Sequence, residues 1–310
     1  MKVNILLIPN KLKKGDKIGI IAPSATIQDC DLKKLNESTE LLENYGFSIV
    51  FSKNAYENEW GYSASAKQKA DDINNMFANK DIKAILAATG GYNSSSTFEY
   101  LDYELISKNP KILCGFSDTT SITNIISEKC NMVTFSGPTF KSLTSWQTDY
   151  AYKQFIKKFV DGDTNLFEPK EECYVINEGS AEGKLVGGNL SLIAKLSSGN
   201  FKVDFKDKIL FLEELCFESS PELVCENLFF MKHNGVFNDI KGMWLGNYNG
   251  EVPIEKIVLD VLDNNYNFPI IKSDNFGHID EKMIIPIGVK AKIDTNDKTK
   301  IKLLEKCCEQ

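Results

Sequence analysis

The sequence Lys-Ile-Leu-Cys-Gly-Phe-Ser-Asp-Thr-Thr occupies residues 111–120, and an isoleucine-rich stretch with helical spacing follows it. This order predicts a strand, a sharp turn and a helix, with Ser117 at the turn. Such an elbow pushes the serine Oγ away from the backbone and leaves N–H groups free at the helix N-terminus. A nucleophile needs this exposure, and it needs donors for the oxyanion that its attack creates. Serine is also an ordinary N-cap residue, so these ten residues alone leave both interpretations open.

The residues on either side of this elbow alternate between strand and helix patterns. Apolar runs predict strands at residues 17–23, 47–51, 82–88, 112–114 and 132–135, and helical spacing predicts helices at 32–45, 64–77 and around 122–126. This alternation is typical of a parallel α/β sheet. Functional groups gather at the carboxyl ends of the strands in such sheets, so we expect Gly90-Gly91 and Ser117 to lie close together.

A second α/β unit follows a break in this pattern. Residues from about 145 to 180 are polar and rich in turn formers, and we interpret them as a linker or crossing loop. Beyond them, the patterns predict strands at 208–212, 240–246, 269–271 and 284–293, and helices at 190–196, 221–233 and 254–262. The length of 310 residues predicts about two domains, and we place them at residues 1–165 and 166–310.

The charge of the chain restricts its partners. A net charge of −7 argues against nucleic acid or an anionic membrane as the main partner. All 36 basic residues are lysines, and the chain contains no arginine. An anionic group on a substrate must therefore meet lysine, backbone N–H groups or a helix N-terminus, because no planar guanidinium is present.

Other features of the composition predict a cytoplasmic protein without a cofactor. The apolar run before Pro9 is too short for a secretory signal, and no stretch approaches the roughly 18 apolar residues of a membrane span. Eight scattered cysteines without a Cys-x-x-Cys pair, together with two histidines, offer poor material for a zinc site. We expect free thiols, no metal and no cofactor.

A serine nucleophile needs a base, and histidine is the usual one because it titrates near neutral pH. His233 ends a predicted helix, where a cation is favourable against the helix dipole, so a structural role is favoured for it. His278 lies in a glycine-bearing loop between predicted strands, a place where active-site residues are common. His278 is therefore the candidate base.

The group that orients the base should come from a rigid element. Glu213 ends the predicted strand at 208–212, and Glu214 follows it. Strand alternation puts the two carboxylates on opposite faces, so that one can face the site and the other solvent. Either could also be an ordinary charge at a strand end. Thr119 replaces the second glycine of Gly-x-Ser-x-Gly, so the elbow is not that motif.

Two glycine pairs could also take part in the site. Gly90-Gly91 could donate a backbone N–H to an oxyanion, cradle a phosphate or simply make a turn. Gly187-Gly188 precedes Asn189, whose amide could contact a substrate, or the three residues could form a structural turn.

These segments resemble the LD-carboxypeptidases, serine peptidases with a Ser-Glu-His triad. The matching segments occur in family order at residues 89–92, 115–118, 187–190, 210–213 and 276–278. The resemblance implies a flavodoxin-like N-terminal domain, a swivelling β/β/α C-terminal domain, a site between them and a homodimer. It implies the following roles: nucleophile Ser117, acid Glu213, base His278, oxyanion donors in the backbone of Gly90, Gly91 and Asp118, and substrate contacts from Asn189 and Tyr92.

Within the family, the chain is most similar to the microcin C immunity branch. The similar stretches are residues 101–110, 136–138, 175–179, 218–222 and 285–288. This similarity implies cleavage of the amide between a C-terminal aspartyl residue and a modified adenylate. The loop before Tyr174 lacks the tryptophan that stacks on the nucleotide in that branch, and Phe167 or Tyr174 is the candidate replacement.

Three alternatives accompany this hypothesis. The first is a murein tetrapeptide LD-carboxypeptidase that removes a terminal D-Ala in cell-wall recycling. The second is a non-catalytic protein that binds a small peptide in the same cleft. The third, a phosphate or nucleotide module at Gly90-Gly91, is disfavoured because the chain lacks Gly-x-x-x-x-Gly-Lys.

Overall fold

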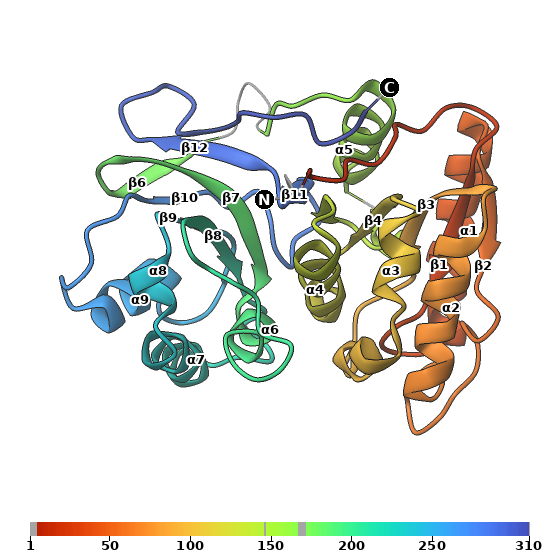
Figure 1. Cartoon of the computed structure of the whole chain (residues 1–310), viewed down its shortest axis with the longest axis horizontal. Coiled ribbons are helices and arrows are strands. Elements are labelled where there is room, and N and C mark those ends of the chain that lie inside the picture. The colour runs from red at the N-terminus through yellow and green to blue at the C-terminus, as the bar shows by residue number, and fades with distance from the viewer. Residues whose placement is uncertain (1–4, 146, 167–171, 310) are drawn as a thin grey trace.

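The computed structural model describes residues 5–145, 147–166 and 172–309, and it contains two sheets. The units built on them lie side by side along the long axis of the molecule, with the N-terminal unit on the right of Figure 1 and the second unit on the left. This arrangement confirms the predicted mixed α/β fold with two units.

The first sheet has five parallel strands in the order β2-β1-β3-β4-β5. This is the strand order of flavodoxin-like folds. Apolar residues occupy both faces of the strands because helices cover the sheet on each side. The strands are β1 (Lys17–Ile21), β2 (Ser48–Phe51), β3 (Ile82–Ala87), β4 (Ile112–Gly115) and β5 (Thr134–Ser136).

The helices of the first unit divide between these two faces. Leu35 and Leu42 of α1 pack in one apolar cluster, whereas Ile73 of α2 and Ile125 of α4 pack in the other. A capping box at Ser65, in which its hydroxyl accepts from Gln68, fixes the start of α2. The helices are α1 (Asp29–Tyr45), α2 (Ala66–Ala78), α3 (Tyr103–Ser107) and α4 (Thr120–Cys130).

The predicted linker contains a helix, so that part of the prediction is wrong. Helix α5 (Tyr150–Ile156) continues into one π-helical turn, Lys157–Asp161. Phe155 and Phe159 are fully buried and meet edge to face, with ring centroids 5.1 Å apart. Their spacing of four residues is a helical apolar stripe, which the surrounding polar residues conceal in the sequence.

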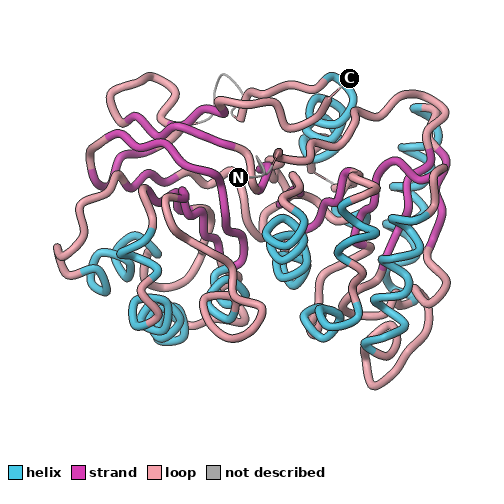
Figure 2. Tube along the Cα trace, in the orientation of Figure 1, coloured by secondary structure: helices cyan, strands magenta, loops and turns pink. Residues whose placement is uncertain are grey.

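The second sheet has the order β13-β12-β7-β8-β9-β10-β6. Its four central strands, β7 to β10, are parallel, and β6, β12 and β13 are antiparallel to their neighbours. In Figure 2 the helices of this unit all lie below the sheet. The elements are β6 (Tyr174–Asn177), β7 (Ser180–Asn189), α6 (Leu190–Lys195), β8 (Lys208–Glu213), α7 (Pro221–His233), α8 (Val236–Asp239), β9 (Gly242–Leu245), α9 (Ile254–Leu262), β10 (Ile270–Lys272), β12 (Lys290–Asp294) and β13 (Ile301–Leu303).

One predicted strand, at residues 284–293, is in fact two strands in different sheets. Strand β11 (Ile285–Ile287) pairs antiparallel with β5 at the edge of the first sheet, and β12 then joins the second sheet. Gly288, at φ +88°, turns the chain between them, a conformation that glycine adopts without strain. The chain therefore returns to the first sheet late in the sequence, while the division at 165/166 stays a prediction.

Helix α4 and strand β7 join the two units through polar contacts. The Asn124 side chain accepts the Gly187 N–H at 3.2 Å and donates to the Gly187 carbonyl at 2.9 Å. Thr120 Oγ1 accepts the N–H of Asn189 at 3.2 Å. A Cβ on Gly187 would lie 1.9 Å from the Phe211 carbonyl oxygen of β8, so only glycine fits at this position.

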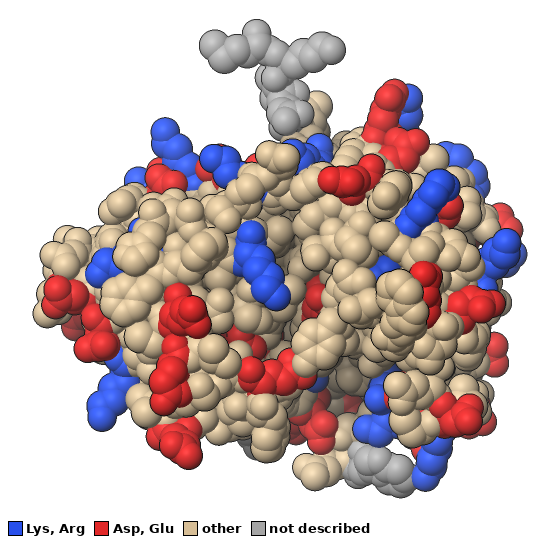
Figure 3. Space-filling view, turned by 90° about the horizontal axis from the view of Figure 1, so that it is seen from below, with Lys and Arg blue, Asp and Glu red and all other residues tan. Residues whose placement is uncertain are grey.

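The distribution of surface charge and the apolar length of the helices limit the possible partners. On the face shown in Figure 3, lysine side chains are scattered among carboxylates and do not gather into a basic surface. No helix within the described ranges is both long and apolar enough to cross a membrane.

Asn124→Ala should lower the free energy of unfolding by about 2 kcal/mol or more, because it leaves a buried N–H and a buried carbonyl of Gly187 without partners. Urea denaturation followed by circular dichroism measures the change. Lys129→Ala, on an exposed position of the same helix, is the matched control. Equal stability of the two variants would contradict a structural role for Asn124.

Candidate active site

Ser117 lies at the turn between β4 and α4, as predicted. The chain enters the helix through a single 3₁₀ turn, Ser117–Thr119, and Ser117 has a φ of +57°. This left-handed conformation is strained for a residue with a Cβ, and such strain is typical of functional turns. Gly115 permits the turn, since a Cβ on it would lie 2.7 Å from a methyl group of Thr119.

Buried hydrogen bonds of Asp118 hold this elbow in place. Asp118 Oδ2 accepts the Ser24 hydroxyl at 2.6 Å and the Ser94 N–H at 2.8 Å, and the Ser94 hydroxyl donates to the Asp118 carbonyl. Burial raises the pKa of Asp118, although these hydrogen bonds partly offset the effect. The buried Lys69 ammonium donates to the Asn93 carbonyl in the same region. The sequence suggested only a backbone role for Asp118 and gave no signal for its side chain.

Gly90 and Gly91 lie beside the elbow, where the sequence places them. A Cβ on Gly90 would be 3.1 Å from Ser117 Oγ. Gly91 has a φ of +129°, and a Cβ on it would be 2.7 Å from the Cβ of Ala25. Gly91 therefore lets the loop after β3 pass close to the loop after β1, and a side chain on Gly90 would crowd Ser117.

Glu213 and His278 form a hydrogen-bonded pair. His278 Nδ1 and Glu213 Oε2 are 2.7 Å apart, and their side chains are 14% and 3% exposed. Gly277, at φ +123°, brings the loop over the carboxylate, since a Cβ on it would lie 3.1 Å from Glu213 Oε2. The other carboxylate oxygen, Oε1, has no hydrogen-bond partner among the described residues.

Opposing effects act on the imidazole of His278. Burial lowers the pKa of His278, but the hydrogen bond and the negative charge of Glu213 together raise the pKa above its ordinary value of 6.5. A carboxylate at Nδ1 also favours the tautomer with the proton on Nδ1, which leaves Nε2 able to accept a proton.

Two cavities meet at Ser117. The first, of about 460 Å³, is lined by Ser117, Gly90, His278 and Lys282 among others, and we call it the imidazole-side cavity. The second, of about 600 Å³, includes Ser117 and Asp118 but not His278. In the described parts of the chain, no hydrogen bond joins Ser117 Oγ to His278, a bond that often tightens only when substrate is bound.

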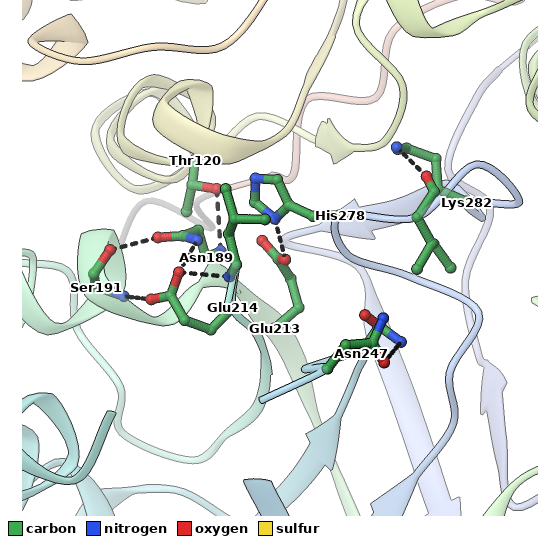
Figure 4. Close-up of polar contacts among 11 residues, drawn as sticks. Thr120, Asn189, Ser191, Glu213, Glu214, Asn247, His278 and Lys282 are labelled. Carbon is green, nitrogen blue, oxygen red and sulfur yellow. Dashed lines mark hydrogen bonds and ion pairs between the residues drawn. The ribbon is translucent and has the colours of Figure 1, made fainter. Parts of the chain in front are cut away.

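Glu214 does not face solvent, contrary to the possibility that strand alternation raised. It is 3% exposed and accepts hydrogen bonds from the Asn189 side chain at 2.7 Å, the Ser191 N–H at 2.9 Å and the Leu215 N–H at 2.8 Å. Figure 4 shows this cluster beside Thr120, with the Glu213–His278 pair next to it. Helix α6 begins directly after Asn189, so the hydrogen bonds of Glu214 to Asn189 and Ser191 fix the turn at the start of that helix.

The remaining candidates differ in whether they line a cavity at Ser117. Asn189 is buried and Tyr92 is exposed, and both line the second cavity. Tyr174 is exposed on β6 and lines neither cavity, and Phe167 lies outside the described residues. His233 is exposed at the end of α7 and lines neither cavity. No group of three metal-binding side chains occurs among the described residues.

Lys282 and Phe116 were missed as site residues in the sequence. The Lys282 ammonium lies 4.1 Å from the centroid of the Phe116 ring, and that ring packs edge to face on His278 at 5.0 Å. Phe116 directly precedes the elbow and Lys282 follows His278 by four residues, but nothing in the sequence indicates that they meet.

Replacing Glu213 with Gln should lower the pKa of His278. The exchange keeps the side-chain size but removes the charge that raises the pKa, while the burial that lowers it remains. Titration of the His278 ring protons by NMR measures the shift, and His233→Gln assigns the only other histidine signal. An unchanged or higher pKa in the variant would contradict the electrostatic role of Glu213.

Two domain profiles match the chain. The LD-carboxypeptidase N-terminal domain matches residues 18–137, and the LD-carboxypeptidase C-terminal domain matches residues 182–293. The probable murein peptide carboxypeptidase of Bacillus subtilis is 31% identical to the chain, with 94% of this chain and 93% of the relative covered. The microcin C7 self-immunity protein MccF of Escherichia coli is 28% identical, with 94% of each covered.

Solved structures show the same relationship. An MccF-like protein from Bacillus anthracis superposes with a TM-score of 0.86 at 31% identity, covering 96% of this chain and 99% of that one. MccF in complex with aspartyl sulfamoyl adenosine superposes with a TM-score of 0.87 at 26% identity, covering 98% and 100%. The chain therefore belongs to the LD-carboxypeptidase family and is a serine-type carboxypeptidase.

Proposed function

We propose that Ser117, His278 and Glu213 form a catalytic triad that hydrolyses an amide bond. The observation that carries this proposal is the 2.7 Å Glu213–His278 hydrogen bond in the wall of the cavity that contains Ser117. Ser117 Oγ attacks the carbonyl carbon, and His278 Nε2 takes the serine proton and returns it to the leaving amine. Water then attacks the acyl-enzyme ester by the same route, with His278 as base, and restores the free serine.

We also propose which groups stabilise the oxyanion. Backbone N–H groups of Gly90, Gly91 and Asp118 stabilise the negative oxygen of the tetrahedral intermediate. The close approach of Gly90 to Ser117 Oγ and the position of Asp118 at the start of a helical turn support this role. In comparable sites, one such donor contributes about 100-fold to 1,000-fold to kcat.

Two substrates follow from the relatives. The proposed substrate is a small peptide or a peptidyl or aminoacyl nucleotide of the microcin type, supported by the MccF structure that contains aspartyl sulfamoyl adenosine. The alternative is a murein tetrapeptide with a terminal D-Ala, supported by the relative named for murein peptides. Phe167 and Tyr174 stay the candidates for base stacking, and Tyr174 would have to move to reach the substrate because it lines neither cavity at Ser117. Family membership argues against the peptide-binding alternative without catalysis.

We further propose a cytoplasmic homodimer. The exposed apolar side chains Leu223, Phe229 and Phe230 on α7 support a subunit contact, because such groups are commonly covered in an assembly.

Ser117→Ala should reduce kcat by about 10⁴-fold or more while the chain folds normally, since no other group can form the acyl-enzyme. Single-turnover hydrolysis of the better substrate measures the loss, and circular dichroism checks the fold. Ser127→Ala, the same exchange on α4, is the control and should retain activity. Substantial turnover by the Ser117 variant would remove Ser117 from the mechanism.

Side-by-side assays should show hydrolysis of aspartyl sulfamoyl adenosine, of a murein tetrapeptide, or of both, and in each case Ser117→Ala should abolish it. The ratio of the two kcat/KM values identifies the substrate class, because kcat/KM compares transition-state binding directly. Liquid chromatography with mass detection follows the released amine. Hydrolysis of neither compound would contradict the proposed substrates.

A further inference from the structure

Lys282 is a buried cation in the wall of the imidazole-side cavity. Its residue is 6% exposed, and it belongs to the loop between β10 and β11 that also carries His278. Its ammonium donates to the Ile279 carbonyl and lies over the Phe116 ring. An ammonium carries three donors, so this arrangement leaves hydrogen-bonding capacity toward the cavity.

Among the described residues, no carboxylate lies within ion-pair distance of this cation. Within the described ranges Lys282 forms no ion pair, whereas the neighbouring Lys141 is paired with Asp31. Burial lowers the pKa of Lys282 to about 8, although the more distant charges of Glu213 and Asp280 act in the opposite direction. A buried, unpaired charge is costly, and an anion bound beside it would recover part of that cost.

The chemistry of the triad decides which part of a substrate enters this cavity. His278 returns its proton to the leaving nitrogen, so the group attached to that nitrogen must lie on the imidazole side of Ser117. Of the two cavities that meet at Ser117, only the imidazole-side cavity is lined by His278, and Lys282 lines that cavity as well. The Phe116 ring contacts both side chains, and the positive charge of Lys282 acts on His278 and lowers its pKa.

We propose that the Lys282 ammonium binds an oxyanion group on the leaving side of the scissile amide and thereby sets the substrate specificity of the enzyme. This inference rests on the proposed triad. Two sources supply the same chemistry. A terminal amino acid carries its carboxylate two bonds from the leaving nitrogen, and an aminoacyl nucleotide carries its sulfonyl or phosphoryl oxygens on the atom bonded to that nitrogen.

The composition of the chain supports a lysine in this role. No arginine is present, so a bidentate guanidinium cannot bind the anion. The lysine that lines the second cavity, Lys195, is exposed to solvent, and the carboxylate of Glu218 lines the same cavity. A partly desolvated ammonium binds an oxyanion more strongly than an exposed one does, because water screens it less.

The test measures binding without turnover, in a Ser117→Ala background, by titration calorimetry. The probes are a murein tetrapeptide ending in D-Ala, the same peptide with a C-terminal carboxamide, and aspartyl sulfamoyl adenosine. In the chain that retains Lys282, we expect one of two results. Either the tetrapeptide with a free terminal carboxylate binds about tenfold or more tightly than its carboxamide, or aspartyl sulfamoyl adenosine binds with an affinity that calorimetry can measure. Lys282→Met keeps the stem and removes the charge, and thermal melting checks that it folds.

Each outcome decides one question. If Lys282→Met binds the free-acid tetrapeptide no more tightly than the carboxamide, the anion that Lys282 binds is a terminal carboxylate. If the variant instead loses about tenfold in affinity only for aspartyl sulfamoyl adenosine, the anion belongs to the nucleotide. Lys282→Arg should retain the preference because it keeps the charge. Unchanged affinities for all three probes in Lys282→Met, or loss of the preference in Lys195→Met instead, would overturn the proposal.

Turnover separates this proposal from the triad. If the chain with Ser117 hydrolyses a probe and Lys282→Met leaves every affinity unchanged, the inference about Lys282 fails and the triad stands. If no probe is hydrolysed while Lys282→Met still abolishes the acid preference, the triad fails and the anion site stands. Failure of all probes to bind overturns the assignment of the cavity to the leaving group.

Discussion

The hydrogen bonds between Asn124 and Gly187 fix the position of helix α4 in the first unit relative to strand β7 in the second. Asn124 lies on the helix that begins directly after the Ser117 elbow, and Gly187 lies on β7 beside the strand that ends at Glu213. Both hydrogen bonds are buried, so shifting β7 along α4 would leave two backbone groups without partners. The distance between Ser117 in one unit and the hydrogen-bonded Glu213–His278 pair in the other therefore depends on the Asn124 amide.

Glycines make the close approaches that the site requires. A side chain on Gly90 would crowd Ser117, one on Gly277 would crowd Glu213, and one on Gly187 would collide with β8. At each of these glycines the backbone lies against a polar group of another element, namely a hydroxyl, a carboxylate or a carbonyl. Loops that converge from different strands can thus surround one serine without opening the core beneath it.

Charge is distributed unevenly around Ser117. A buried carboxylate of Asp118 braces the elbow from below, and a second, Glu213, acts on the imidazole. The buried Lys282 ammonium lies in the wall of the cavity that Ser117 and His278 also line. Low-dielectric surroundings strengthen all three interactions, because little water remains to screen them.

Local periodicity was enough to predict the alternation of strands and helices and the elbow at Ser117. The scarcity of histidine and its place in a loop made His278 the candidate base. The sequence by itself could not show that residues 150–161 are helical, that the stretch at 284–293 divides between two sheets, or that Glu214 is buried. The contact of Lys282 with Phe116 was equally hidden. Each of these features is visible only in the folded chain, because it depends on packing between segments far apart in the sequence, which local patterns do not encode.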